Sequence, residues 1–182
     1  MNQRWFQPDT RPHSLMTHRG GISSFSLNAI SAGQTNVAQA STVWPAANLA
    51  IYVPFRIAMP MIITQVFWAN GATVNGNVDL GIYNADQTQR MSAGTTAQSG
   101  VSTMQFVNTA DHLLPAGLYY MALASDSATA TFLAGTLASI QRGAMMGMAE
   151  QTTAFVLPSP ATMATFGRTY LPLFGLGVGT IL

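Results

Sequence analysis

The segment NVDLGIYNAD, residues 77–86, combines the alternation of a β-strand with the turn-forming residues that end one. Val78, Leu80 and Ile82 place apolar side chains at every second position, and the residues between them are mixed in character. This period of two predicts a half-buried strand. Residues 84–92 predict a turn and a returning partner strand. Because a lone hairpin cannot bury its apolar face, other strands must pack against it.

Further segments with strand patterns recur at short intervals. In residues 49–57 apolar side chains alternate, whereas residues 61–68 are almost uniformly apolar, which predicts a strand covered on both sides. Residues 133–149 leave room for one or two helical turns, since three glycines interrupt them. Recurrent strands without long helical periodicity predict an all-β sandwich. The other segments expected to form strands are 22–30, 101–107, 118–124, 128–133, 152–157 and the apolar close at 168–182.

The first quarter of the chain differs from the rest, and we predict a division into two parts. Residues 1–47 are expected to be an extended N-terminal arm and linker, and residues 48–182 a β-sandwich domain with an apolar C-terminal strand or tail. The beginning of the arm has neither helical nor strand periodicity, and residues 31–47 are a polar stretch expected to act as the linker. We expect such an arm to lie along a neighbouring subunit.

Charge is scarce in this chain. Charged residues make up 7% of it, against about 25% in an ordinary domain. A compact monomer of this length exposes about 8,500 Å², and seven basic and six acidic side chains are few for that area. Much of the surface is therefore expected to be covered by other subunits. All basic residues are Arg, which suits interface ion pairs, although the codon usage of a GC-rich genome explains the absence of Lys equally well.

Composition also argues against several partners. A net charge of +1 gives no electrostatic footprint for nucleic acid. The longest apolar run, residues 170–182, is short and contains a proline and three glycines, so we expect no membrane span. With no cysteine, the chain has no disulfide, zinc–thiolate site or thiol nucleophile.

The ionisable residues show no arrangement that predicts catalytic, cofactor-binding or metal-binding residues. Asp79 lies in the middle of an expected strand, where an ion pair with Arg56 or Arg90 is expected. Asp111 and His112 are adjacent, but no nucleophile motif accompanies them, and the three histidines lack metal-ligand spacing. We therefore expect a protein that is not an enzyme and that needs no cofactor. The acidic residues expected at turns or caps are Asp86, Asp111 and Asp126.

Four aromatic residues are the candidates for ligand contact: Tyr52, Trp68, Tyr83 and Tyr119. If their rings shared an exposed face, they would form a platform on which a sugar stacks. Aromatic side chains also fill cores and subunit interfaces, and the low surface charge favours that packing role. The sequence leaves both interpretations open.

The runs NVDLGIYNAD and LPAGLYYMALASDSATATF, with NLAIYVPFRI upstream, resemble a pattern of minor virion proteins of tailed bacteriophages. The resemblance covers residues 48–132 and consists of strands and turns, without a catalytic motif. Carbohydrate-binding β-sandwiches show similar patterns. The resemblance implies a jelly-roll-like antiparallel β-sandwich on a phage particle, as a capsid decoration, head-fibre or tail-associated protein.

Two functional expectations follow from these observations. The first is a non-enzymatic structural protein of the virion that contacts capsid or tail subunits and forms a homo-oligomer, for which the resemblance favours a trimer. The second is a carbohydrate-binding module that recognises a host glycan from the virion surface. Low charge, the apolar close and the long arm favour the first.

Overall fold

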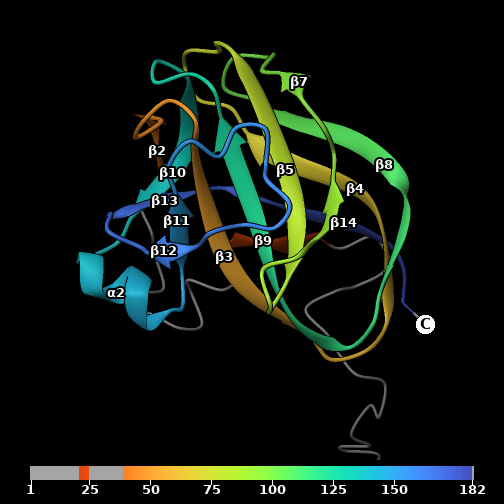
Figure 1. Ribbon diagram of the computed structural model, residues 1–182. Coiled ribbons are helices and arrows are strands. Elements are labelled where there is room, and N and C mark those ends of the chain that lie inside the picture. Colours follow the sequence, from red (N-terminus) through yellow and green to blue (C-terminus); the bar gives the residue numbers. More distant parts are fainter. Residues whose placement is uncertain (1–20, 25–38, 182) are drawn as a thin grey trace, which may run out of the picture.

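The computed structural model describes residues 21–24 and 39–181. Within these ranges the chain forms fourteen strands and the short helix α2 (Ile140–Met145), and every strand pairing is antiparallel (Figure 1). The predicted all-β antiparallel sandwich is therefore confirmed, as are the helical turns expected within residues 133–149. No helix of these ranges is long and apolar enough to cross a membrane.

The strands form three sheets. The large sheet contains, in spatial order, β12 (Ala164–Thr165), β11 (Ala149–Gln151), β3 (Leu49–Ile57), β9 (Gly117–Ser125), β5 (Asn77–Asn84) and β6 (Gln89–Ser92), with β7 (Thr96–Ala97) paired to β5. The β4 sheet contains β1 (Gly21–Ser23), β14 (Phe174–Ile181), β4 (Met61–Ala69) and β8 (Met104–Leu114). The β10 sheet contains β13 (Tyr170–Pro172), β10 (Thr131–Thr136) and β2 (Gln39–Val43).

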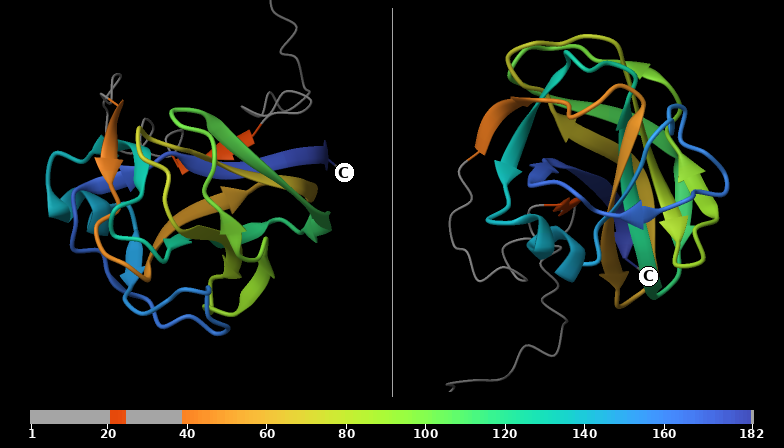
Figure 2. Two further views of the ribbon diagram at one scale, coloured as in Figure 1. Left: turned by 90° about the horizontal axis from the view of Figure 1, so that it is seen from above. Right: turned by 60° about the vertical axis from the view of Figure 1, so that its left-hand side comes forward.

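The main core lies between the large sheet and the β4 sheet (Figure 2). Val78, Leu80 and Ile82 of β5 point into this core and are fully buried, as the alternation predicts. From the opposite sheet, Trp68 and Phe174 pack into the same core. Successive side chains of a strand point to opposite faces, so the period of two correctly identifies the core face of β5.

The other face of the large sheet is buried as well. Residues 152–163, which we call the cover segment, cross this face as an irregular loop (Figure 1). The expected half-buried β5 is therefore wrong, and so is the strand expected at residues 152–157. Gly81 permits the close approach, because a Cβ atom there would lie 2.7 Å from the Met91 carbonyl oxygen and 3.0 Å from Leu157 Cδ1.

A buried carboxylate ties the cover segment to β5. Asp79 is fully buried and accepts hydrogen bonds from the Ser92 hydroxyl at 2.8 Å and from the Leu157 N–H at 3.1 Å, one on each oxygen. The expected ion pair of Asp79 with Arg56 or Arg90 is therefore wrong. Uncharged donors satisfy this carboxylate instead, as a buried polar group requires.

The strands β4 and β8 also differ from expectation. β4 buries Ile63, Val66 and Trp68 but leaves alternate residues on its other face half-exposed, so it is not covered on both sides. β8 extends to Leu114, and Asp111 therefore lies in a strand and not at a turn. The pairing of β8 with β4 shifts register in this part of the strand.

Both ends of the described chain belong to the sandwich. β2 lies within the expected linker and pairs with β10, so the linker is wrong for residues 39–43. β1 pairs with β14. The arm expected at residues 1–20, and residues 25–38, lie outside the described residues. The apolar close packs within the chain itself, since Leu171 and Phe174 are fully buried.

Replacing the buried carboxylate tests its structural role. Asp79→Ala is expected to cost about 1–3 kcal/mol of unfolding free energy, because it leaves the Leu157 N–H buried without an acceptor. Asp79→Asn is the matched control, since an amide keeps one acceptor oxygen and can donate to the Ser92 hydroxyl. Denaturant titration measures both losses, and hydrogen exchange of the Leu157 amide should accelerate in Asp79→Ala. Equal stability of the two variants would contradict this role.

Candidate interaction surfaces

The four candidate aromatic residues are buried in two separate places. Trp68 and Tyr119 belong to the main core. Trp68 donates its Nε1–H to Asn70 Oδ1 at 2.9 Å, and the Tyr119 hydroxyl donates to the Pro115 carbonyl at 2.9 Å. Their polar atoms are thus satisfied within the chain, as expected for buried Trp and Tyr.

Tyr52 and Tyr83 lie on the opposite face of the large sheet, beneath the cover segment. Their rings meet edge to face with centroids 5.4 Å apart. The Tyr52 hydroxyl donates to Gln151 Oε1 at 3.0 Å, and the Tyr83 hydroxyl donates to the Pro158 carbonyl at 2.6 Å. Burial raises the pKa of Tyr52 and raises the pKa of Tyr83 to about 12, so both hydroxyls are neutral at neutral pH.

The sugar platform is therefore wrong for these residues. None of the four exposes more than 5% of its surface, so no ring face is open for stacking. The structure brings Tyr52 and Tyr83 together but places Trp68 and Tyr119 on the other side of the large sheet. All four stabilise the domain itself.

Two of the three expected turn aspartates are confirmed. Asp86 accepts hydrogen bonds from the hydroxyl and the N–H of Thr88, and these lower the pKa of the Asp86 carboxyl. Asp126 accepts from the backbone and side-chain N–H groups of Asn77, both at 2.7 Å. These carboxylates are occupied by local structure and offer no acid–base pair.

A polar contact joins the edges of the two main sheets. Arg90 of β6 donates to the Leu113 carbonyl of β8 at 3.2 Å. Three side-chain atoms near this contact are buried without a hydrogen-bond partner in the described chain. Two belong to β8, His112 Nε2 and Thr109 Oγ1, and the third is Arg90 Nε itself. Burial and the charge of Arg90 lower the pKa of His112. In the described ranges, no three residues among His, Cys, Asp and Glu are placed to hold a metal ion.

An exposed apolar surface follows β8, the edge strand of the β4 sheet. Met104, Phe106 and Leu113 expose 39%, 55% and 48% of their surface. Asp111 lies among them, is exposed, and is the one acidic residue of the described chain without a hydrogen-bond or ion-pair partner. We call Met104, Phe106, Asp111 and Leu113 the β8 surface.

The neighbouring outer face of β4 continues this surface without charge. Phe67 packs beside Phe106 with ring centroids 5.8 Å apart, and Gln65 Nε2 donates to Asn108 Oδ1 at 2.8 Å. The outer edge of β8 has no strand partner in the described chain, and such edges are ready to accept other chains. An apolar, nearly uncharged sheet face is typical of a surface that another protein covers.

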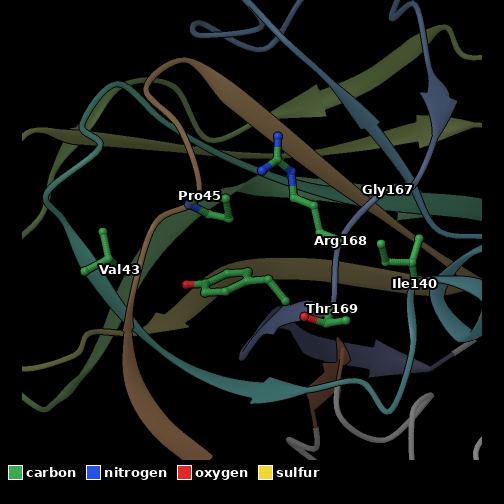
Figure 3. A pocket seen from close by; sticks show the side chains of 7 residues that line it. Val43, Pro45, Ile140, Gly167, Arg168 and Thr169 are labelled. Atoms are coloured by element: carbon green, nitrogen blue, oxygen red, sulfur yellow. The ribbon is translucent and has the colours of Figure 1, made fainter.

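A groove lies on another part of the molecule, where β2, α2 and β13 meet. Its volume is about 340 Å³, and it is lined by Val43, Pro45, Ile140, Gly167, Arg168, Thr169 and Tyr170. We call this the Arg168 groove. Figure 3 shows Val43 and Ile140 on opposite sides of the groove, with Pro45 and Arg168 between them. Val43 and Ile140 expose 53% and 46% of their surface, so the walls are apolar and open.

Glu150 holds the side chain of Arg168 in this groove. Arg168 Nε donates to Glu150 Oε2 at 2.8 Å, and the two side chains expose 29% and 17% of their surface. Among the described residues neither Nη group of Arg168 has a hydrogen-bond partner. A guanidinium fixed through Nε keeps these donors free for a planar acceptor such as a carboxylate. The groove can therefore bind an apolar group next to a negative charge.

Sequence reasoning identified neither surface. The β8 surface left a signal, because Met104 and Phe106 are apolar residues two positions apart within a strand that was predicted. Only the pairing order reveals that this strand forms an edge. The Arg168 groove left no signal, since its residues come from three segments far apart in the sequence.

Comparisons of the chain with protein-family models, with curated proteins and with solved structures give no match.

Because His112 Nε2 is buried, we expect the stability of the domain to depend on pH. Because the folded state lowers the pKa of His112, unfolding takes up a proton, and stability should fall as pH drops through and below about 6.5. Between pH 7.5 and 5, the wild-type chain should lose more unfolding free energy than His112→Gln, which is neutral at both values. Nuclear magnetic resonance titration should place the His112 pKa below 6.5. A His112 pKa above that value would refute the assignment.

Proposed function

We propose that this chain is a non-enzymatic structural protein of a tailed-bacteriophage virion, a capsid decoration, head-fibre or tail-associated component that assembles through its β-sandwich. The virion setting rests on the resemblance of residues 48–132 to minor virion proteins. The assembly role rests on the surfaces of the described domain.

The observation that carries the proposal is the β8 surface together with the half-exposed outer face of β4. The interior of the domain is complete, since even the second face of the large sheet is covered by the chain's own residues. The remaining exposed apolar side chains, such as Phe106 at 55%, are therefore not needed to complete the hydrophobic core of the domain. Exposed apolar side chains along one face of a sheet, on a domain whose core is already packed, support contact with another protein.

The alternative of a carbohydrate-binding module has less support. Its four candidate aromatic residues are buried, and no observation of the described chain favours another sugar-binding group. An enzymatic function also lacks support, because the carboxylates of Asp86, Asp126 and Glu150 are engaged in local contacts.

Particle composition tests the proposal. In purified particles of the phage that encodes this chain, peptide mass spectrometry is expected to detect it in a fixed ratio to the capsid or tail proteins. Phe106→Asp should reduce its incorporation because it places a charge in the contact. It also removes the ring that packs beside Phe67, so the melting temperature is measured to show that the variant is still folded. Leu118→Asp is the matched control, since Leu118 is also an exposed strand residue, at 52%, and lies outside both surfaces. Absence of the wild-type chain from purified particles would refute the virion role.

A further inference from the structure

The β8 surface and the Arg168 groove lie on opposite sides of the sandwich. Figure 1 shows β8 at one edge of the molecule and α2 with β2 at the other, and the views in Figure 2 agree. The two surfaces belong to different sheets, since β8 is one edge strand of the β4 sheet and β2 is one edge strand of the β10 sheet. One copy of the chain can therefore use both surfaces at once, each toward a different neighbour.

The two surfaces are chemically complementary. The β8 surface presents apolar side chains around the free carboxylate of Asp111. The Arg168 groove presents apolar walls around a guanidinium whose Nη groups are free. The hydrogen bonds of an arginine–carboxylate pair are charge-assisted, about twice as strong as neutral ones, and the pair is often bidentate. Apolar contact on both sides would shield such a pair from water.

A second cation, Arg56, is also without a partner in the described chain, but it suits this role less well. Arg56 is exposed on β3 and does not line the Arg168 groove. A fully exposed ion pair contributes little, since solvent screens it and both side chains lose freedom. Glu150 already holds Arg168 in place, so the groove loses less conformational freedom on binding.

We propose that the β8 surface of one copy docks into the Arg168 groove of the next copy, with Asp111 pairing with Arg168. This inference rests on the self-assembly in the proposed function and names its contact. The contact is heterologous, because two different surfaces meet, and its repetition produces a closed ring or an open filament. A trimeric ring is the smallest cyclic assembly of this kind and fits the expectation from the virion resemblance.

Self-pairing of either surface is less favourable. Two β8 surfaces facing each other carry a carboxylate each and no cation among their four residues, so neither Asp111 would gain an ion-pair partner. Two grooves facing each other would likewise leave the free Nη groups of Arg168 without a new carboxylate. The mixed contact alone gives Asp111 an arginine, so charge complementarity favours it over both symmetric contacts.

Disulfide trapping tests the contact directly, because the natural chain has no cysteine. Ala110→Cys adjoins Asp111, and Thr169→Cys lines the groove; both positions are exposed and both charges stay in place. Under mild oxidation the double variant is expected to form covalent multimers on non-reducing gels. Each single variant is the matched control and should stay uncrosslinked, since its cysteines would lie on different contacts.

The outcomes of this test separate the inference from the proposed function. A covalent dimer of Ala110→Cys alone would show β8 pairing with β8, and a dimer of Thr169→Cys alone would show groove pairing with groove; either overturns the head-to-tail contact. No crosslink in a chain that light scattering shows to be oligomeric overturns the contact but leaves the assembly role intact. No crosslink in a monomeric chain overturns the contact and the self-association, and the presence or absence of the wild-type chain in purified particles then decides the virion role separately.

Charge reversal gives a second, independent readout. Asp111→Arg is expected to weaken self-association by about tenfold or more, and the double variant Asp111→Arg/Arg168→Gln should recover part of that loss, because it removes the repulsion between the two arginines without placing a second carboxylate beside Glu150. Arg56→Glu is the matched control, because it reverses the charge of an exposed arginine outside both surfaces and should leave association unchanged. Melting temperatures verify that all variants fold. Equal weakening by Arg56→Glu and Asp111→Arg would overturn the assigned pair.

Discussion

The structure depends on the burial of the large sheet on both faces. One face packs on the β4 sheet, and the other is closed by residues 152–163 of the same chain. The carboxylate of Asp79 holds that closure, because it accepts from Ser92 in the hairpin and from Leu157 in the cover segment. A charged group fully removed from water is costly unless donors satisfy it, so this contact couples the position of the cover segment to the integrity of β5.

The all-β class, most strands and the core face of β5 could be predicted, since alternation at a period of two reports directly which side chains share a face. What alternation cannot report is whether something covers the other face. β5 has a mixed second face and was expected to be half-buried, yet Gly81 gives Leu157 room to approach. β4 is almost uniformly apolar and was expected to be covered on both sides, yet half of it faces outward. In both strands the burial of the second face depends on which segments pack there in the folded chain, and alternation within the strand carries no information about those segments.

For the same reason, the sequence could not show that the candidate aromatic residues are buried. Tyr52 and Tyr83 are of the residue type that a ligand platform uses. The cover segment that buries them lies about 70 to 110 residues further along the chain. The apolar residues left outside are those of β8 and of the Arg168 groove. The scarcity of charge thus has two physical sources in this molecule: a sheet covered twice by its own chain, and outward-facing surfaces suited to other protein. The second source connects the composition to assembly.

Sedimentation velocity of the full chain across the micromolar range tests whether the exposed apolar surfaces of this sandwich are contacts between copies of the chain. We expect a discrete species at an integral multiple of the monomer mass, which shifts toward the monomer when Phe106→Asp places a charge on the β8 surface. A wild-type chain that sediments as a stable, soluble monomer throughout this range would contradict self-association through these surfaces.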